Sequence, residues 1–266
     1  MFAYLIGTGL LGIVWLILFL RRKDLRHAMI WSAMFYIVML SIGFLLLYLV
    51  NLDPSMRINP GYWTPPTLFD LNNKTGGYSI EDALFMFFMA GIAAAVYEEV
   101  TNRRILKKVD RRLKKRHALW IGLLGSVIVC SIFNLNAMYL LIFFNLFGGM
   151  AIIYQRPDLL KQAVLSAVLL VAIYWVLFSI YNILFADFIA KYDHLEHTTK
   201  LIILGIPLEE YLYAFTFGFI WAPLYEYEHQ VRDRRSGHKS KIKKHPAKKK
   251  AILPGFNTRF ARVRIR

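Results

Sequence analysis

The chain lacks the residues that several common kinds of site require. Its 266 residues include one cysteine, Cys130, which excludes a disulfide within the chain and a zinc site built on cysteine pairs. All seven histidines fall in predicted loops or tails, so Ser-His-Asp catalysis has no candidate base. The last long apolar segment contains no lysine, which excludes a retinal Schiff base in that segment.

Charged residues are also scarce, at 19%, whereas 57% of the residues are hydrophobic and the mean hydropathy is +0.43. A soluble domain of this length needs far more polar surface, and long uncharged runs are typical of helices that cross a membrane. We therefore expect an all-α integral membrane protein. Its seven predicted transmembrane helices cover residues 2–20, 28–50, 79–98, 118–134, 137–154, 162–186 and 201–225.

Lysine and arginine are absent from all seven segments, and their placement predicts the orientation of the chain. Because basic residues concentrate on the cytoplasmic side, we expect the N-terminus outside and the C-terminus in the cytoplasm of a multi-pass cell-membrane protein. The first segment lacks the basic region and cleavage site of a signal peptide, so we expect it to be retained. All but four of the 33 basic residues lie in every second connection between the predicted segments or in the C-terminal tail. The four exceptions are Arg57, Lys74, Lys191 and Lys200.

The net charge of +16 owes much to a lysine-rich tail that directly follows the last apolar segment. A basic segment in this position is typical of contact with anionic lipid headgroups. We therefore expect membrane lipids as its partner, and no nucleic acid. The tail, residues 229–266, is predicted to be disordered and cytoplasmic.

Cofactor motifs fail when their structural context is considered. Gly7-Thr8-Gly9-Leu10-Leu11-Gly12 matches the dinucleotide-binding fingerprint only as a string of letters. That motif works at a strand-to-helix turn, whereas here it opens a membrane helix, where small residues permit close helix packing. Aspartate-rich motifs for magnesium and diphosphate do not occur. We therefore expect no flavin, nicotinamide or metal cofactor.

Two acidic pairs open two apolar helices at matched positions. One helix begins with Ser79-Ile80-Glu81-Asp82 and the other with Pro207-Leu208-Glu209-Glu210, at an offset of 128 residues. Because both helices run inward from outside, the match predicts two parallel three-helix repeats joined by one extra helix. The same offset relates Phe87 to Phe215, Tyr97 to Tyr225, and Glu98 to Glu226.

The repeats divide the chain into four parts. Residues 1–98 form the first three-helix repeat, and 99–134 a basic loop with the linking helix. Residues 135–228 form the second repeat, and the basic tail follows. The 51–78 connection is rich in proline and glycine, which predicts irregular structure on the outer side. Its Tyr62 and Trp63 are typical of an interfacial belt, or alternatively of a lid over a site.

Helix capping offers a structural explanation for the acidic pairs. Ser79-x-x-Asp82 is a capping-box pattern, and carboxylates in a first turn interact favourably with the helix dipole by about 0.3–1 kcal/mol. Carboxylates at a membrane span are nevertheless unfavourable, so their repetition in register favours a function. Glu209 and Glu210 are the stronger candidates. We expect Glu98 and Glu226, 17 residues further on, in ion pairs at the cytoplasmic edge.

The acidic pairs and their aromatic neighbours suit carbocation chemistry on an apolar substrate. A carboxyl group in an apolar site can stay protonated and act as an acid, while a better solvated neighbour acts as a base. Aromatic rings stabilise cations, although each ring can equally serve only to pack helices. The rings at helical spacing from the acids are Phe85, Phe88, Tyr213 and Phe217.

Pro207-Leu208-Glu209-Glu210, followed by an aromatic helix, resembles the P-x-E-E/D motif of the lycopene cyclase domain family, the type without a flavin motif. Ile80-Glu81-Asp82 is similar to the motif of that family's first subunit, with Ser79 in place of the usual proline. The resemblance covers about residues 1–230. It implies redox-neutral, proton-initiated cyclisation of the ψ ends of lycopene, a lipid-soluble carotenoid, with Glu81, Asp82, Glu209 and Glu210 as catalytic acids.

Two other functions fit the same features. A related carotenoid end-group enzyme, such as a hydratase, would use the same protonation and trap the cation with water. A non-enzymatic membrane carrier would use the acids to relay protons. Transporters favour acids near the membrane midplane and broken helices, whereas these acids lie near the predicted outer ends of their helices. The sequence therefore favours an enzyme.

Overall fold

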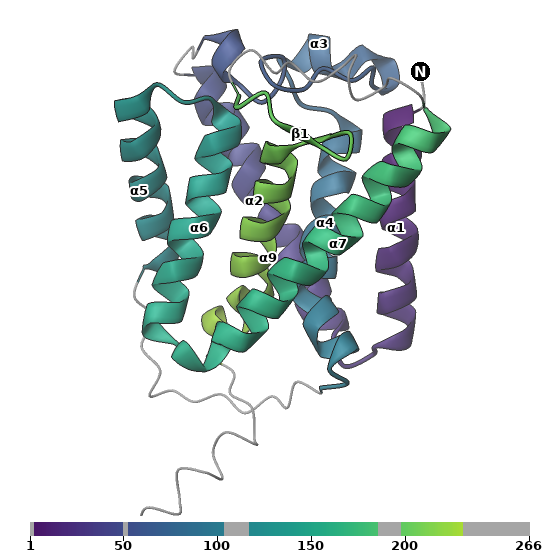
Figure 1. Cartoon of the computed structure of the whole chain (residues 1–266), viewed down its shortest axis with the longest axis vertical. Coiled ribbons are helices and arrows are strands. Elements are labelled where there is room, and N and C mark those ends of the chain that lie inside the picture. Colours follow the sequence, from purple (N-terminus) through teal and green to yellow (C-terminus); the bar gives the residue numbers. More distant parts are fainter. Residues whose placement is uncertain (1–2, 50–52, 104–116, 186–197, 231–266) are drawn as a thin grey trace, which may run out of the picture. The chain divides into compact units, whose positions relative to one another are not determined.

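The computed structural model describes residues 3–49, 53–103, 117–185 and 198–230, all within one compact unit, Met1–Arg232. The predicted tail from 231 onward and most of the basic 99–117 loop lie outside these residues. Within them, the chain forms seven helices of at least 16 residues (Figure 1). These are α1 (Ala3–Arg21), α2 (Arg26–Leu49), α4 (Ile80–Val100), α5 (Ala118–Phe133), α6 (Ala137–Gln155), α7 (Leu160–Leu184) and α9 (Leu208–Glu228).

Five of these segments are long and apolar enough to cross a membrane. They are α1, residues Arg26–Leu46 of α2, α4, α6 and the stretch Pro157–Leu184, which joins the short 3-10 helix η3 (Pro157–Leu159) to α7. The prediction of a mostly helical chain with several segments suited to span a membrane is thereby confirmed. Seven crossings, the repeats and the orientation stay predictions.

Helices α4 and α9 form the centre of the bundle. They contact each other, with α1, α2 and α7 also packing on α4, and α2, α6 and α7 also packing on α9. In α4, 67% of the apolar stretch is buried, against 28% in α1. Helix α5 packs on α6 at the periphery (Figure 1). The two acidic helices are therefore sheltered by protein, which explains how α9 accommodates four glutamates.

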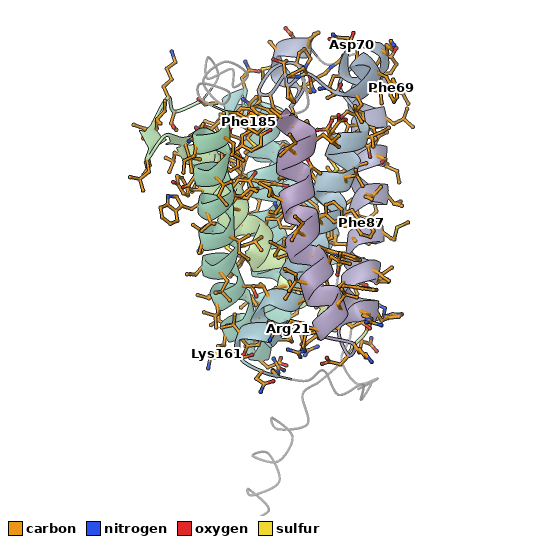
Figure 2. All side chains as sticks on the ribbon, turned by 90° about the vertical axis from the view of Figure 1, so that its right-hand side faces the viewer. Arg21, Phe69, Asp70, Phe87, Lys161 and Phe185 are labelled. Carbon is orange, nitrogen blue, oxygen red and sulfur yellow. The ribbon has the colours of Figure 1, made fainter. Side chains whose placement is uncertain are left out.

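The two ends of the bundle are formed by different parts of the chain. Arg21 and Lys161 lie at one end, and Asp70 and Phe185 at the other (Figure 2). The second end is covered by the connection between α2 and α4, which contains the short helices η1 (Pro54–Met56), η2 (Leu68–Asp70) and α3 (Leu71–Thr75). The irregular structure predicted for 51–78 thus includes three short helices, and this segment lies over the N-terminal ends of α4 and α9.

The two acidic helices, α4 and α9, are preceded by different local structures. Ser79 caps α4 in a complete capping box, because its side chain accepts from the Asp82 N–H while the Asp82 carboxylate accepts from the Ser79 N–H. This confirms the capping-box prediction. Before α9, strands β1 (Ile202–Ile203) and β2 (Ile206–Pro207) pair as an antiparallel hairpin.

The predicted start of the seventh helix at residue 201 is therefore wrong. Leu204 and Gly205 both have positive φ, 52° and 78°, which is the backbone of a two-residue hairpin turn. Pro207 then has no N–H to donate, and the helix begins at Leu208. The apolar residues before Pro207 look helical by hydropathy, but turn geometry decides their structure.

Helices α7 and α9 approach so closely that only glycine fits at position 218. A Cβ on Gly218 would lie 2.8 Å from both the Ala167 Cα and the Ser166 carbonyl oxygen. Both atoms belong to the α7 backbone, which cannot move aside without displacing the helix. Small residues allow this kind of approach in membrane helices.

Gly218→Ala should therefore lower the stability of the protein, by about 1–3 kcal/mol for an overpacked contact. The measurement is the thermal midpoint of unfolding in detergent, followed by tryptophan fluorescence. The matched control is Gly9→Ala on α1, where a Cβ would meet nothing within 4 Å. A midpoint for Gly218→Ala equal to that of the control would contradict the packing described here.

Candidate active site

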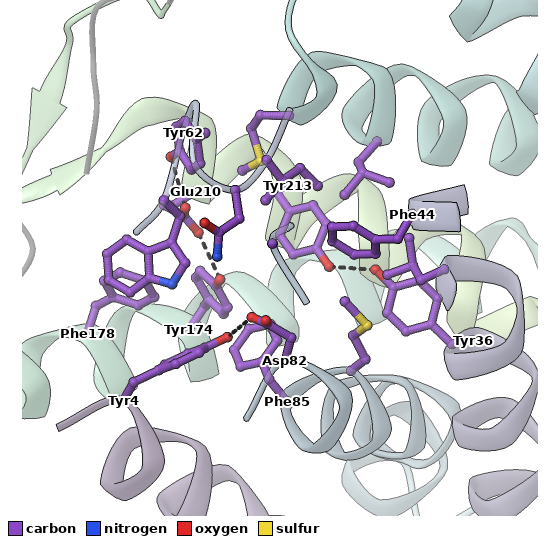
Figure 3. Close-up of a pocket in the computed structure, with 18 residues that line it drawn as sticks. Tyr4, Tyr36, Phe44, Tyr62, Asp82, Phe85, Tyr174, Phe178, Glu210 and Tyr213 are labelled. Carbon is purple, nitrogen blue, oxygen red and sulfur yellow. Dashed lines mark hydrogen bonds between the residues drawn. The ribbon is translucent and has the colours of Figure 1, made fainter. Parts of the chain in front are cut away.

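An apolar cavity lies between the N-terminal ends of α4 and α9, with about 790 Å³ of empty space. The connection between α2 and α4 covers it, and Tyr62 and Trp63 of that connection line it. Aromatic and aliphatic side chains form most of its wall, and among the described residues its only carboxylates are Asp82 and Glu210 (Figure 3). The lid interpretation of Tyr62 and Trp63 thus agrees with the geometry.

The Asp82 carboxylate accepts three hydrogen bonds. The Tyr4 hydroxyl of α1 donates to Oδ1 at 2.6 Å. The backbone N–H and the hydroxyl of Ser79 donate to Oδ2 at 2.9 and 2.7 Å. The Asp82 carboxylate therefore caps its own helix through Oδ2. Its Oδ1 bonds Tyr4, another residue of the cavity wall.

The Glu210 carboxylate is held by two phenols from different parts of the chain. Tyr62 donates to Oε1 at 2.8 Å, and Tyr174 of α7 donates to Oε2 at 2.8 Å. Figure 3 shows these bonds together with the Tyr4–Asp82 bond. A buried carboxylate needs such donors, because burial without them is strongly unfavourable. Glu210 thereby ties the covering segment and α7 to α9.

Asp82 and Glu210 are the positions related by the offset of 128 residues. The structure brings these matched positions to one cavity, as it does the matched pair Phe85 and Tyr213. The two central helices therefore run in the same direction and present equivalent residues to a shared space.

Glu81 and Glu209, the other members of the acidic pairs, are buried but do not line the cavity. Glu81 Oε1 accepts from the Leu68 N–H at 2.7 Å. Glu209 Oε1 accepts from the Thr199 N–H and hydroxyl at 2.7 and 2.8 Å, and from the Tyr139 hydroxyl at 2.7 Å. Each carboxylate thus fixes the segment that precedes its helix.

Of the four predicted aromatic residues, likewise, two line the cavity and two do not. Phe85 and Tyr213 line the cavity. Phe88 instead packs on α1, with its ring centroid 6.0 Å from that of Trp15. Phe217 packs in the core, where its ring centroid is 5.5 Å from that of Trp221. Helical spacing alone does not distinguish a ring that faces the cavity from one that packs between helices.

Three tyrosines of the site are absent from the sequence prediction: Tyr4, Tyr36 and Tyr174. The Tyr36 and Tyr213 hydroxyls lie 2.8 Å apart in a buried pair on the cavity wall. A signal was available, because the hydroxyl of a tyrosine buried in an apolar helix usually has a partner. Buried carboxylates elsewhere in the chain are natural partners for such groups.

Glu98 and Glu226 form a second buried pair near the C-terminal ends of α4 and α9, away from the cavity. Gln162 of α7 donates to Glu98 Oε1 at 3.0 Å and to the Ala222 carbonyl at 3.2 Å. Glu226 lies 3.9 Å from the Arg103 guanidinium, which agrees with the predicted ion pairing. Both glutamates are nevertheless buried, at 0% and 2% exposure, and do not emerge at the edge as predicted.

Comparison with protein families shows to which family the chain belongs. A family model described as lycopene cyclase matches residues 2–100 and 136–228. The chain belongs to the lycopene cyclase family. Comparison with curated proteins gives no match, and comparison with solved structures gives none.

Family membership points to an enzyme of carotenoid biosynthesis with a carotenoid cyclase-like role. A lycopene cyclase acts on a lipophilic substrate, and the five apolar helices agree with a membrane protein. The matched segments contain Asp82 and Glu210 and every helix except α5. The cavity described above therefore lies wholly within the part of the chain that defines the family.

Glu209→Gln should loosen the segment before α9 and leave the cavity formed. A neutral amide is a weaker acceptor for the three donors that meet at Glu209 Oε1, and charge-assisted bonds are about twice as strong as neutral ones. We expect faster amide hydrogen exchange at Thr199, measured by mass spectrometry. Glu228→Gln, on the same helix, is the control, and equal exchange in both variants would refute the anchoring role.

Proposed function

We propose that this protein cyclises the ψ end groups of lycopene, or of a closely related linear carotenoid, by a redox-neutral reaction through a carbocation. The observation that carries the proposal is the presence of two carboxylates, Asp82 and Glu210, in one apolar and aromatic cavity. Family membership supports the substrate class. The apolar and aromatic lining of the cavity suits one end of such a molecule.

The hydrogen bonds suggest different roles for the two carboxylates. Glu210 meets only phenol hydroxyls, which can donate or accept, so it can carry a proton without losing its partners. Asp82 Oδ2 accepts from a backbone N–H, which can only donate, so this oxygen is held unprotonated. Glu210 is therefore the proposed acid, and Asp82 the proposed base.

The reaction balances in protons and electrons. Glu210 protonates the terminal double bond, which leaves a tertiary carbocation on the chain. The neighbouring double bond attacks this cation, and a carbon–carbon bond closes the ring. The ring cation then loses a proton to Asp82, and the proton returns to Glu210 before the next turnover. The product is an isomer of the substrate.

The wall of the cavity supports this chemistry in two ways. Phe85, Tyr174 and Tyr213 place aromatic rings around the space, and aromatic faces stabilise cations. The covering segment with Tyr62 and Trp63 limits the entry of water, which would trap the cation as an alcohol. Hydration is the outcome expected of the alternative, hydratase-type enzyme.

We further propose that seven helices cross the membrane as two parallel repeats, with α5 as the linking helix. The family model matches in two separate segments, one for each repeat, which supports this arrangement. A second repeated motif supports it too. Arg22 pairs with Asp24 after α1, and Arg156 pairs with Asp158 after α6, each through two hydrogen bonds.

Expression in a lycopene-accumulating bacterium tests the proposed reaction. We expect cyclic products from the natural sequence, and at least about a 100-fold loss with Glu210→Gln, because a general acid typically contributes that much. Pigments are extracted and separated by chromatography, with Glu228→Gln as the control. Unchanged lycopene in cells that contain well-folded natural protein would overturn the proposal.

Solvent isotope incorporation tests the protonation step. In deuterated water, each new ring should carry one deuterium from the acid, and the product should otherwise have the mass of the substrate. Mass spectrometry of the purified pigment gives the answer. A product heavier by one water molecule would identify a hydratase, and a ring without deuterium would contradict initiation by protonation.

A further inference from the structure

A second apolar cavity, with about 370 Å³ of empty space, adjoins the first. It lies between α1 and α7, where Gly7, Thr8, Leu177 and Tyr181 line it. The residues that line both cavities are Tyr4, Trp63, Phe85 and Phe178. The two spaces are therefore separated only by these side chains, all four of which are half-buried.

The second cavity reaches the side of the bundle. Helices α1 and α7 cross near the N-terminal end of α1 and diverge below it (Figure 1). They contact each other at Gly7, where any Cβ would clash with the Tyr181 ring. Leu177 is half-buried, and its neighbour Val176 is 48% exposed on the outside of α7. The surface at this point is apolar, as expected of a surface that faces lipid.

The size of the first cavity makes an exit necessary. The cavity is confined to the space around the N-terminal ends of α4 and α9, whereas a linear carotenoid is a long chain. The rest of the chain is apolar and needs an apolar environment, because contact with water is unfavourable in proportion to its area. The covering segment presents backbone polar groups and charged residues, whereas the second cavity is lined by apolar side chains.

We propose that the second cavity binds the polyene chain next to the reacting end, and that the gap between α1 and α7 is the opening through which the substrate enters from the bilayer. The ligand class is a linear isoprenoid chain. This inference rests on the proposed function for the identity of the substrate, but the binding of the chain is separate from the reaction.

Leu177 is the position at which to test this opening, because it lines the second cavity and not the first. Leu177→Trp fills the space, and Leu177→Ala widens it. Val176→Trp is the matched control, since it places the same side chain one residue away, on the exposed side of α7. Thr8→Leu, on α1, fills the same space from the opposite wall if Leu177→Trp does not fold.

The measurement is the amount of lycopene that the purified protein retains after incubation in detergent, read from the visible absorbance of the pigment. Each change is made in a Glu210→Gln background so that turnover does not consume the ligand. We expect Leu177→Trp to retain about tenfold less lycopene than Val176→Trp, the loss expected when a good part of the buried apolar area is excluded. Leu177→Ala should retain as much as the background.

Equal retention by Leu177→Trp and Val176→Trp would overturn the proposal, as would the absence of retained lycopene in all variants. A failure of the proposed reaction can be distinguished from a failure of the proposed opening. If retention follows the expected pattern but the natural sequence forms no ring, the opening stands and the chemistry is wrong.

Discussion

The burial of carboxylates inside an apolar bundle is the constraint on which the rest of this structure depends. The six acids at matched positions of α4 and α9 are all buried, with at most 8% exposure. A buried carboxylate is tolerated only when donors reach it. For five of the six, those donors come from α1, α6, α7 and the segments before the two acidic helices. Glu226 instead lies 3.9 Å from the guanidinium of Arg103, which follows α4. The packing of the helices is therefore set in part by the need to bring these donors to the carboxylates.

The same constraint separates the acids by role. At each acidic helix, the first carboxylate fixes the preceding segment to its helix, and the second faces the cavity. The two that face the cavity, Asp82 and Glu210, have partners of different kinds, because Ser79 caps α4 while α9, which follows Pro207, has no side-chain cap. Two helices with matched acidic positions thus present two unlike carboxylates, which is what an acid and a base require.

The sequence predicts the helices well because their apolar runs are long and contain no lysine or arginine, and the pairing of the acids follows from their spacing. It does not predict which acid of each pair faces the cavity, because adjacent helical residues point about 100° apart and only packing decides which face of the helix turns to the cavity. Tyr4 and Tyr174 escape prediction for a similar reason, since their partners are 78 and 36 residues away. The hairpin before α9 is missed because hydropathy ignores the turn at Gly205.

The central claim is that Asp82 and Glu210 act as one unit on one end group, although they come from different helices, α4 and α9. A double-mutant cycle on the rate of ring formation tests it most directly, with Asp82→Asn, Glu210→Gln and the combined variant. Residues that act as a unit give non-additive effects. The account predicts that the combined variant is no slower than the slower single variant. Losses that multiply would show two independent contributions and contradict it.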